Sequence, residues 1–165
     1  LNGGFERWAA EKQPVGTDIP AIEPSHYPAG AKDVFTMDYR QVRERLGLKD
    51  TVIIDVRPEE FYAGRKVEEA RGGHIPGALN RPYSKDVIKV GGVTLLKPVN
   101  DLAGAYARLI PSRDTKVIVH CRTGHQASQT FFVLRNLLGY ANVSWYDAGW
   151  SEWAARTELP AETTP

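Results

Sequence analysis

The sequence predicts an α/β fold, with a mostly parallel sheet and helices on both of its faces. Two observations lead to this prediction. Continuous apolar runs rich in β-branched residues, TVII at 51–54 and KVIV at 116–119, are typical of strands buried on both faces of a parallel sheet. Segments with the apolar spacing of amphipathic helices separate these runs, and strands that alternate with helices form βαβ units.

The segment 36–46 is expected to form a short helix. Val42 and Leu46 are four positions apart in FTMDYRQVRERLGLKD and share one helical face. Thr36 is the expected N-cap of this helix. Gly47 is its expected stop, because glycine is common just after the last helical residue.

The strand TVIIDVR at 51–57 is expected to lead into a helix and then into turns. Pro58 suits the first turn of a helix, where its missing N–H costs nothing. GGHIPGALNRPYS at 72–84 is rich in turn residues, so a loop is expected there.

The second half of the chain repeats the alternation of helix and strand. Its two longer expected helices have apolar residues three or four positions apart, namely Leu102, Tyr106 and Leu109 in the first and Ala127, Phe131, Leu134 and Leu138 in the second. The second of these is expected to end at Gly139. KVIVH at 116–120 and NVSWYD at 142–147 are expected strands, and AGWSEWAAR at 148–156 is an expected closing helix.

Composition and charge exclude several classes of protein. With 42% hydrophobic and 25% charged residues, the chain has the composition of a globular domain with a core. A net charge of +1 with interspersed signs indicates no nucleic-acid or membrane partner.

The apolar runs are too short to span a bilayer. The compartment stays open between cytoplasm and periplasm, because a targeting segment would precede residue 1. The single cysteine excludes an internal disulfide and a multi-cysteine metal site.

A sequence motif near the start of the chain recurs near its end. In LNGGFERWAAEKQP (1–14) and YDAGWSEWAARTELP (146–160), glycine precedes an aromatic residue, and a tryptophan three positions later leads into Ala-Ala and then proline. Self-similarity at a long interval indicates a repeated unit. Residues 1–14 are therefore expected to be the tail of a preceding, missing domain rather than an N-terminal helix of a single domain. The Pro-rich residues 15–33 are expected to form a strap between domains, and residues 34–165 the second domain.

Cys121 is the expected centre of the chemistry. It follows the buried strand 116–120 and precedes a polar loop with Gly124 at its centre, after which a helix is expected near Ala127. A cysteine that only packs in the core would have no reason to be followed by a polar loop that contains glycine. Loop amides and the positive end of the helix dipole favour a thiolate at this place, and Arg122 adds a charge beside it. The sequence therefore predicts a nucleophile that needs no histidine base.

Four stretches of the chain are similar to the motifs of a known family. They are the loop Cys121-Arg122-Thr123-Gly124-His125-Gln126-Ala127-Ser128, GGHIPGALN at 72–80, DAGWSEW at 147–153 and IIDVRPEEF at 53–61. In these motifs, and in their order and spacing, the chain from about 34 to 160 resembles the rhodanese-type sulfurtransferases. The resemblance implies a central, mostly parallel, five-stranded sheet with helices on both faces.

The resemblance also implies an activity. Cys121 would be the catalytic residue and would carry a sulfane sulfur as a persulfide, from thiosulfate or a related small anionic donor to a thiol or cyanide acceptor. The residues from Arg122 to Ala127 would form the active-site loop, and no cofactor or metal is implied. Tandem members of the family have their catalytic cysteine in the second of two domains. The missing N-terminal rhodanese domain is therefore an expected partner, joined through the strap 15–33.

Gln126 departs from the family pattern. Enzymes that act on thiosulfate tend to close the loop with arginine, and those that act on mercaptopyruvate with small or hydroxyl residues. Gln126 can donate hydrogen bonds but carries no charge. Mercaptopyruvate and polysulfide therefore stay open as donors. A non-catalytic binding or regulatory module is a further alternative, which an intact loop with Cys121 argues against.

Five residues outside the loop are expected to support it. Asp55 and Arg57 end the strand beside the cysteine strand, and we expect them to brace the loop through hydrogen bonds and an ion pair. Arg65 and Arg71 flank the region of the GHIPG turn and are candidates to attract an anionic donor. Trp150 follows a glycine at a strand end, and a place in the wall of the pocket is expected for it.

Two other sites are disfavoured. Phosphatase-type loops also begin with His-Cys, but their anion-clamping arginine would fall at Ala127. A metal site from His74, His120, Cys121 and His125 is disfavoured because His120 and Cys121 are neighbours on a strand and should point to opposite faces. His74 is expected to be a structural turn residue. His125 is expected to be either a polar residue at the rim of the site or a solvated bystander.

Overall fold

The computed structural model describes residues 2–26 and 35–164. The helices are α1 (Gly4–Ala10), α2 (Tyr39–Arg43), α3 (Glu59–Tyr62), α4 (Val99–Tyr106), α5 (His125–Phe132) and α6 (Gly149–Ala155), with a 3₁₀ turn η1 (Tyr83–Asp86) and a π-helical turn η2 (Val133–Leu137). The strands are β1 (Thr51–Asp55), β2 (Leu79–Asn80), β3 (Val87–Val90), β4 (Val93–Leu96), β5 (Lys116–His120) and β6 (Val143–Tyr146).

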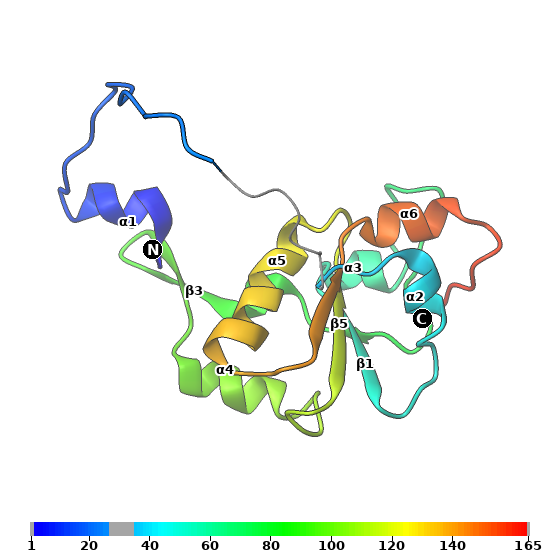
Figure 1. The fold of residues 1–165 in the computed structure, drawn as a ribbon. Coiled ribbons are helices and arrows are strands. Elements are labelled where there is room, and N and C mark those ends of the chain that lie inside the picture. Colours follow the sequence, from blue (N-terminus) through cyan, green and yellow to red (C-terminus); the bar gives the residue numbers. More distant parts are fainter. Residues whose placement is uncertain (1, 27–34, 165) are drawn as a thin grey trace.

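The central sheet has the strand order β2-β1-β5-β6, and all its pairs are parallel (Figure 1). An isolated parallel bridge between Thr36 and Trp145 adds a fifth position beside β6. The α/β class is therefore confirmed, with four strands and this bridge where five strands were expected. In the register of β1 and β5, Asp55 lies opposite His120, so the carboxyl ends of these two strands are neighbours.

Each face of the sheet is covered by its own helices. On one face, strand residues such as Ile54 and Val119 pack with apolar residues of α4, α5 and η2. On the other face, Ile53 and Ile118 pack with residues of α2 and α6. Because side chains alternate along a strand, consecutive residues serve opposite cores. This explains why the strands read as continuous apolar runs, and it confirms the expected helices on both faces.

Two helix starts differ from the sequence prediction. Asp38, not Thr36, caps α2, because its carboxylate accepts the amide of Gln41 while the Gln41 side chain accepts the amide of Asp38. Thr36 instead belongs to the bridge beside β6. Helix α5 begins at His125, two residues before the expected Ala127, because Gly124 with φ +80° is its N-cap.

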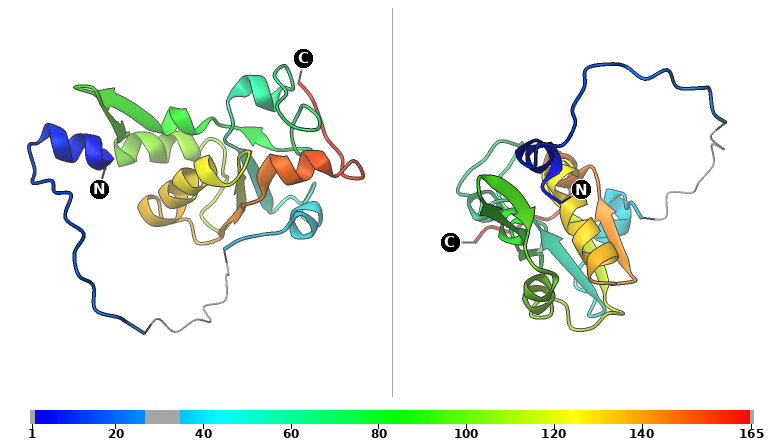
Figure 2. Two further views of the ribbon diagram at one scale, coloured as in Figure 1. Left: turned by 90° about the horizontal axis from the view of Figure 1, so that it is seen from above. Right: turned by 90° about the vertical axis from the view of Figure 1, so that its left-hand side faces the viewer.

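A two-stranded hairpin was absent from the sequence prediction. Strands β3 and β4 form an antiparallel pair that turns at Gly91 and Gly92, both of which have positive φ. Helix α1 lies beside this hairpin, where the Asn2 side chain accepts the amide of Leu96 (Figures 1 and 2). Of the expected strap 15–33, residues 15–26 contain no helix or strand, and 27–33 lie outside the described residues.

Among the described residues, no helix has the length and apolarity that crossing a membrane requires.

Candidate active site

Cys121 is the first residue after β5 and lies at the carboxyl edge of the sheet. Its side chain continues the alternation of Val117 and Val119 and belongs to the same core cluster. Helix α5 begins four residues later, at His125, so the chain turns sharply between strand and helix. Cys121 is only 1% exposed, and its thiol is free. Cys121 therefore lies between the end of the strand and the start of the helix, at the place in the fold where the sequence predicts it.

The loop is held from behind by the start of α6. The amide of Trp150 donates to the Cys121 carbonyl at 2.9 Å, and the amide of Ser151 donates to the Arg122 carbonyl at 3.1 Å. Gly149 permits this approach, since a Cβ there would lie 2.5 Å from the Cys121 oxygen. Gly124 similarly packs on Asp147, whose Oδ1 would lie 2.0 Å from an added Cβ. These contacts give the closing motif DAGW a physical role as the brace of the loop.

An open hollow of about 470 Å³ lies above Cys121. It is lined by Tyr83, Cys121, Arg122, Thr123, His125, Gln126 and Gln129. Five of these seven residues are the expected loop residues together with Cys121 itself, and His125 has an exposed place in the wall. Gly124 and Ala127 do not line this hollow. Ala127 is completely buried in the core below it.

A second, smaller cavity of about 170 Å³ lies next to the first. Its lining includes the apolar side chains Phe61, Val67 and Trp150 together with charged residues. Trp150 thus forms a wall of this cavity rather than of the hollow at Cys121. Arg122 and Gln126 line both spaces, so their side chains form the partition between them.

Arg122 is already paired with carboxylates. Its Nε donates to Oε1 of Glu69, and its Nη1 lies 4.0 Å from Oε2 of Glu68. The hydrogen bond and charge of Glu69 raise the pKa of Arg122 above its ordinary value. The positive charge expected beside the sulfur is therefore present, but two acidic residues from outside the loop compensate it.

The other two candidate arginines do not line the hollow. Arg65 forms an exposed ion pair with Glu59 at 2.5 Å. Arg71 lines the smaller cavity, and its Nη2 donates to the carbonyls of Trp153, Arg156 and Leu159 at distances from 2.7 to 3.1 Å. Arg71 thus closes the carboxyl end of α6 rather than the mouth of the hollow.

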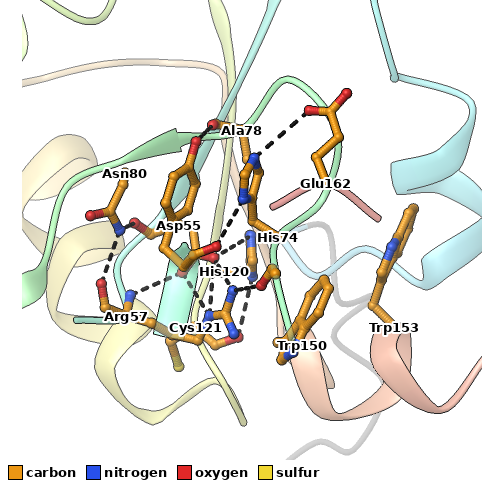
Figure 3. Close-up of polar contacts among 12 residues, drawn as sticks. Asp55, Arg57, His74, Ala78, Asn80, His120, Cys121, Trp150, Trp153 and Glu162 are labelled. Atoms are coloured by element: carbon orange, nitrogen blue, oxygen red, sulfur yellow. Dashed lines mark hydrogen bonds and ion pairs between the residues drawn. The ribbon is translucent and has the colours of Figure 1, made fainter. Parts of the chain in front are cut away.

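Asp55 and Arg57 form a buried ion pair at the end of β1 (Figure 3). The Arg57 Nη2 donates to Oδ2 of Asp55 at 2.5 Å and to the Gly73 carbonyl at 2.7 Å. The Arg57 guanidinium also lies 4.6 Å from the centre of the Trp150 ring. The pair therefore holds the GHIPG turn directly, through Gly73, and Arg57 packs on Trp150, whose amide bonds the Cys121 carbonyl.

His120 and Cys121 point to opposite faces of the sheet. The His120 ring lies on the side of Tyr146, with its Nε2 3.7 Å from Oδ2 of Asp55. Burial lowers the pKa of His120 below 6.5. Burial acts to raise the pKa of Asp55, but nearby His120 and the bonds from Arg57 outweigh it and hold the pKa below 3.8. The opposed directions of His120 and Cys121 agree with the sequence argument against a shared metal ion.

His74 is part of the framework of the GHIPG turn. Its ring stacks on Tyr62 with the ring centres 3.8 Å apart, and its Nδ1 lies 2.9 Å from the Tyr62 carbonyl. The backbone of His74 forms an antiparallel bridge with Glu162, through bonds of 2.8 and 3.0 Å. Gly73 is required here, since an added Cβ would lie 2.2 Å from the Glu162 oxygen.

Tyr83 and Gln129 line the hollow but are absent from the sequence prediction. Gln129 had a signal, because it lies three positions after Gln126 on the same helix and so shares its face. Its Nε2 donates to the Tyr83 carbonyl at 3.0 Å, which links α5 to η1. Tyr83 had no comparable signal, since η1 reaches the hollow only through the tertiary fold.

Most of the chain matches the model of a known family. The profile described as "Rhodanese-like domain" matches residues 38–156. This chain belongs to the rhodanese-like domain family.

Several curated proteins are similar to almost the whole of this chain. A thiosulfate sulfurtransferase from Azotobacter vinelandii is 33% identical over 162 residues, which cover 98% of this chain and 58% of that protein. A thiosulfate sulfurtransferase from Corynebacterium glutamicum is 36% identical, with 99% and 56% covered. The sulfur carrier protein TtuD from Thermus thermophilus is 32% identical, with 97% and 59% covered. The chain thus spans a little under three fifths of each relative.

Solved structures show the same rhodanese-like fold at lower identity. An EanB variant in complex with ergothioneine has a TM-score of 0.87 at 24% identity, covering all of this chain and 41% of that one. The anaerobic ergothioneine biosynthesis enzyme from Chlorobium limicola, in complex with trimethyl histidine, has a TM-score of 0.86 at 24% identity, with the same coverage. At this identity the likeness concerns the fold alone.

Proposed function

We propose that this domain is a sulfurtransferase, which moves a sulfane sulfur from thiosulfate or a related donor to a thiophilic acceptor through a persulfide on Cys121. One observation carries the proposal. The only cysteine of the chain lies at the base of an open hollow, between the carboxyl end of β5 and the first turn of α5. Relatives named thiosulfate sulfurtransferase support it at 32–36% identity.

The proposed reaction has two exchange steps. The Cys121 thiolate attacks the outer sulfur of thiosulfate, so that a new S–S bond forms while the bond between the two donor sulfurs breaks and sulfite leaves with the electron pair. An acceptor thiolate or cyanide then attacks the outer sulfur of the persulfide. That step forms the acceptor–sulfur bond and returns Cys121 as a thiolate. The balance requires no external oxidant or reductant.

The loop supplies the electrostatics of both steps. The first amides of α5 have no partners within the helix, since a helix leaves its first N–H groups free, and the helix dipole is positive at this end. The negative charge is on Cys121 before the first step and on the outer sulfur after it. Preorganised amides can stabilise both states without reorganisation of the loop. The amides of Trp150 and Ser151 bind the carbonyls of Cys121 and Arg122, so these two carbonyls are already occupied.

The lining of the hollow argues for weak binding of thiosulfate. Gln126 stands where thiosulfate enzymes of the family tend to have arginine, and the charge of Arg122 is compensated by Glu69. Neither Arg65 nor Arg71 lines the hollow. We therefore propose that thiosulfate is used with weak apparent affinity, and that a polysulfide or persulfide depends less on these positions.

We also propose that the chain is the second, catalytic part of a tandem protein. The relatives extend well beyond the matched region, because the chain covers 56–60% of their length. The sequence motif at 1–14, which repeats the closing motif around α6, supports a preceding rhodanese domain as the partner.

Incubation with thiosulfate followed by measurement of the intact mass tests the activity. Wild-type protein is expected to gain the mass of one sulfur atom, to release sulfite, and to lose the added mass when cyanide is supplied. The Cys121→Ser variant is expected to gain nothing and to lose all sulfur transfer, because a hydroxyl cannot form a persulfide. Thermal unfolding checks that the variant is folded. Absence of a mass gain in the wild type, or turnover in the serine variant, would contradict the proposal.

A further inference from the structure

We propose that Glu69, assisted by Glu68, determines donor specificity by holding the Arg122 guanidinium on the partition of the hollow, so that donors of low charge are preferred over the thiosulfate dianion. This inference rests on the proposed sulfurtransferase function and assigns the two glutamates a role in it. The preferred donor class is a persulfide of a small organic thiol.

Arg122 is the natural ligand for an anion at this site. Among the seven residues that line the hollow above Cys121, it is the only arginine or lysine. It directly follows Cys121 in the chain, and it also lines the smaller cavity next door. Its side chain therefore stands at the boundary of both spaces. Its position decides whether a fixed positive charge faces the thiol.

The ion pair with Glu69 fixes that position. Glu69 is the more buried partner, since its side chain is 17% exposed while that of Arg122 is 54% exposed. Glu68 lies 4.0 Å from Nη1 of Arg122 and is itself 3.6 Å from the ammonium of Lys66. Both glutamates line the smaller cavity and neither lines the hollow. The carboxylates thus draw the guanidinium toward the side away from Cys121.

This arrangement has a charge consequence at the thiol. An arginine and a glutamate in contact present no net charge to an approaching anion. A dianion that uses Arg122 must compete with Glu69 for the same N–H groups, whereas a donor with little charge does not enter that competition. The uncharged Gln126 on the same partition offers no substitute cation. Removal of the Glu69 charge should therefore favour anionic reagents selectively.

Alkylation of Cys121 measures this selectivity without any sulfur transfer. Iodoacetate and iodoacetamide have nearly the same size, but only iodoacetate is charged. In Glu69→Gln the ratio of the iodoacetate rate to the iodoacetamide rate is expected to rise about two- to fivefold, the range for a partly exposed ion pair. The iodoacetamide rate reports changes in the thiolate fraction and in access to the loop, and because both reagents respond to these changes, they cancel in the ratio. The Michaelis constant for thiosulfate should fall by a similar factor.

Two variants serve as controls. Asp50→Asn removes the same charge from an exposed ion pair with Lys116, before β1 at the opposite edge of the sheet, and should leave the ratio unchanged. In the double variant Glu69→Gln/Arg122→Gln the rise in the ratio of the two alkylation rates should disappear, because that rise depends on a free Arg122 guanidinium. An unchanged ratio in Glu69→Gln would overturn the inference, and so would an equal rise in Asp50→Asn or a rise that persists in the double variant. The thiosulfate mass experiment reports separately on the proposed function.

Discussion

The carboxyl ends of β1 and β5 are neighbours in the sheet, but they use their polar groups in opposite ways. At the end of β1, Asp55 and Arg57 are 0% and 4% exposed and bond to each other and to the backbone of Gly73. At the end of β5, the residues after Cys121 line an open hollow. The end of β1, whose polar side chains bind one another, serves as a framework. The end of β5 opens onto a hollow that Cys121 helps to line, so it is the end that a small molecule can reach.

The largest expected effect concerns the framework end. Asp55→Asn should lower the free energy of unfolding by about 3–5 kcal/mol, because it leaves the Arg57 charge buried without a counter-charge. Urea unfolding followed by circular dichroism measures the loss. Glu59→Gln is the matched control, since it breaks an arginine–glutamate pair that lies on the surface. If both variants lose equally little stability, the end of β1 is not the framework that its contrast with the end of β5 implies.

A smaller effect is expected at the end of β5, on the binding of the sulfur donor rather than on the stability of the fold. Gln126→Arg adds a cation to the partition, and one charge-assisted hydrogen bond is worth about 1.5–3 kcal/mol. The apparent Michaelis constant for thiosulfate should therefore fall by about ten- to a hundredfold. The constant for a persulfide donor should change less, and the unfolding free energy should change little. An unchanged or higher constant for thiosulfate would show that this position does not set the donor.

The smallest expected effect is the pH dependence of the framework end. Because burial lowers the pKa of His120 below 6.5, the unfolded chain binds this proton first as the pH falls. The free energy of unfolding should therefore decrease as the pH falls through 6.5, until the lowered pKa of the folded state is reached. The lowered pKa of Asp55 adds a further loss below 3.8.

Urea unfolding at a series of pH values measures this dependence. His120→Gln should flatten the slope near 6.5, whereas His125→Gln, at the exposed rim of the hollow, should keep it. Equal slopes in the wild type and in His120→Gln would refute the assignment to His120.

Local patterns predicted the backbone and the position of the thiol. Apolar runs, helix spacing and the glycine after Cys121 depend on residues close in the chain, and the structure has the corresponding strands, helices and loop. The hairpin β3–β4 was also predictable, since VIKV and VTLL flank Gly91 and Gly92. The N-cap of α2 was misassigned because Thr36 and Asp38 are both good caps, and Gln41 decides between them.

The partners of individual side chains could not be predicted in the same way. From the sequence, Arg122 is expected to be a free cation beside Cys121, but in the structure it pairs with Glu69, which lies 53 positions earlier in the chain. Arg71 reads as a substrate ligand, but it bonds carbonyls more than 80 positions away. Such pairs depend on how distant segments meet, and no periodicity in one sequence reports that.

The brace behind the loop also has a consequence for synthesis on the ribosome. Cys121 and Arg122 bond to residues 150 and 151, and the GHIPG turn pairs with residue 162. A nascent chain that has exposed β5 and α5 therefore carries its thiol on a loop without its support. Since synthesis proceeds from the N-terminus, the loop cannot gain this support before residue 151 has left the exit tunnel, and the GHIPG turn cannot pair before residue 162 has left it. The loop that holds Cys121 is therefore supported only after most of the domain has been synthesised.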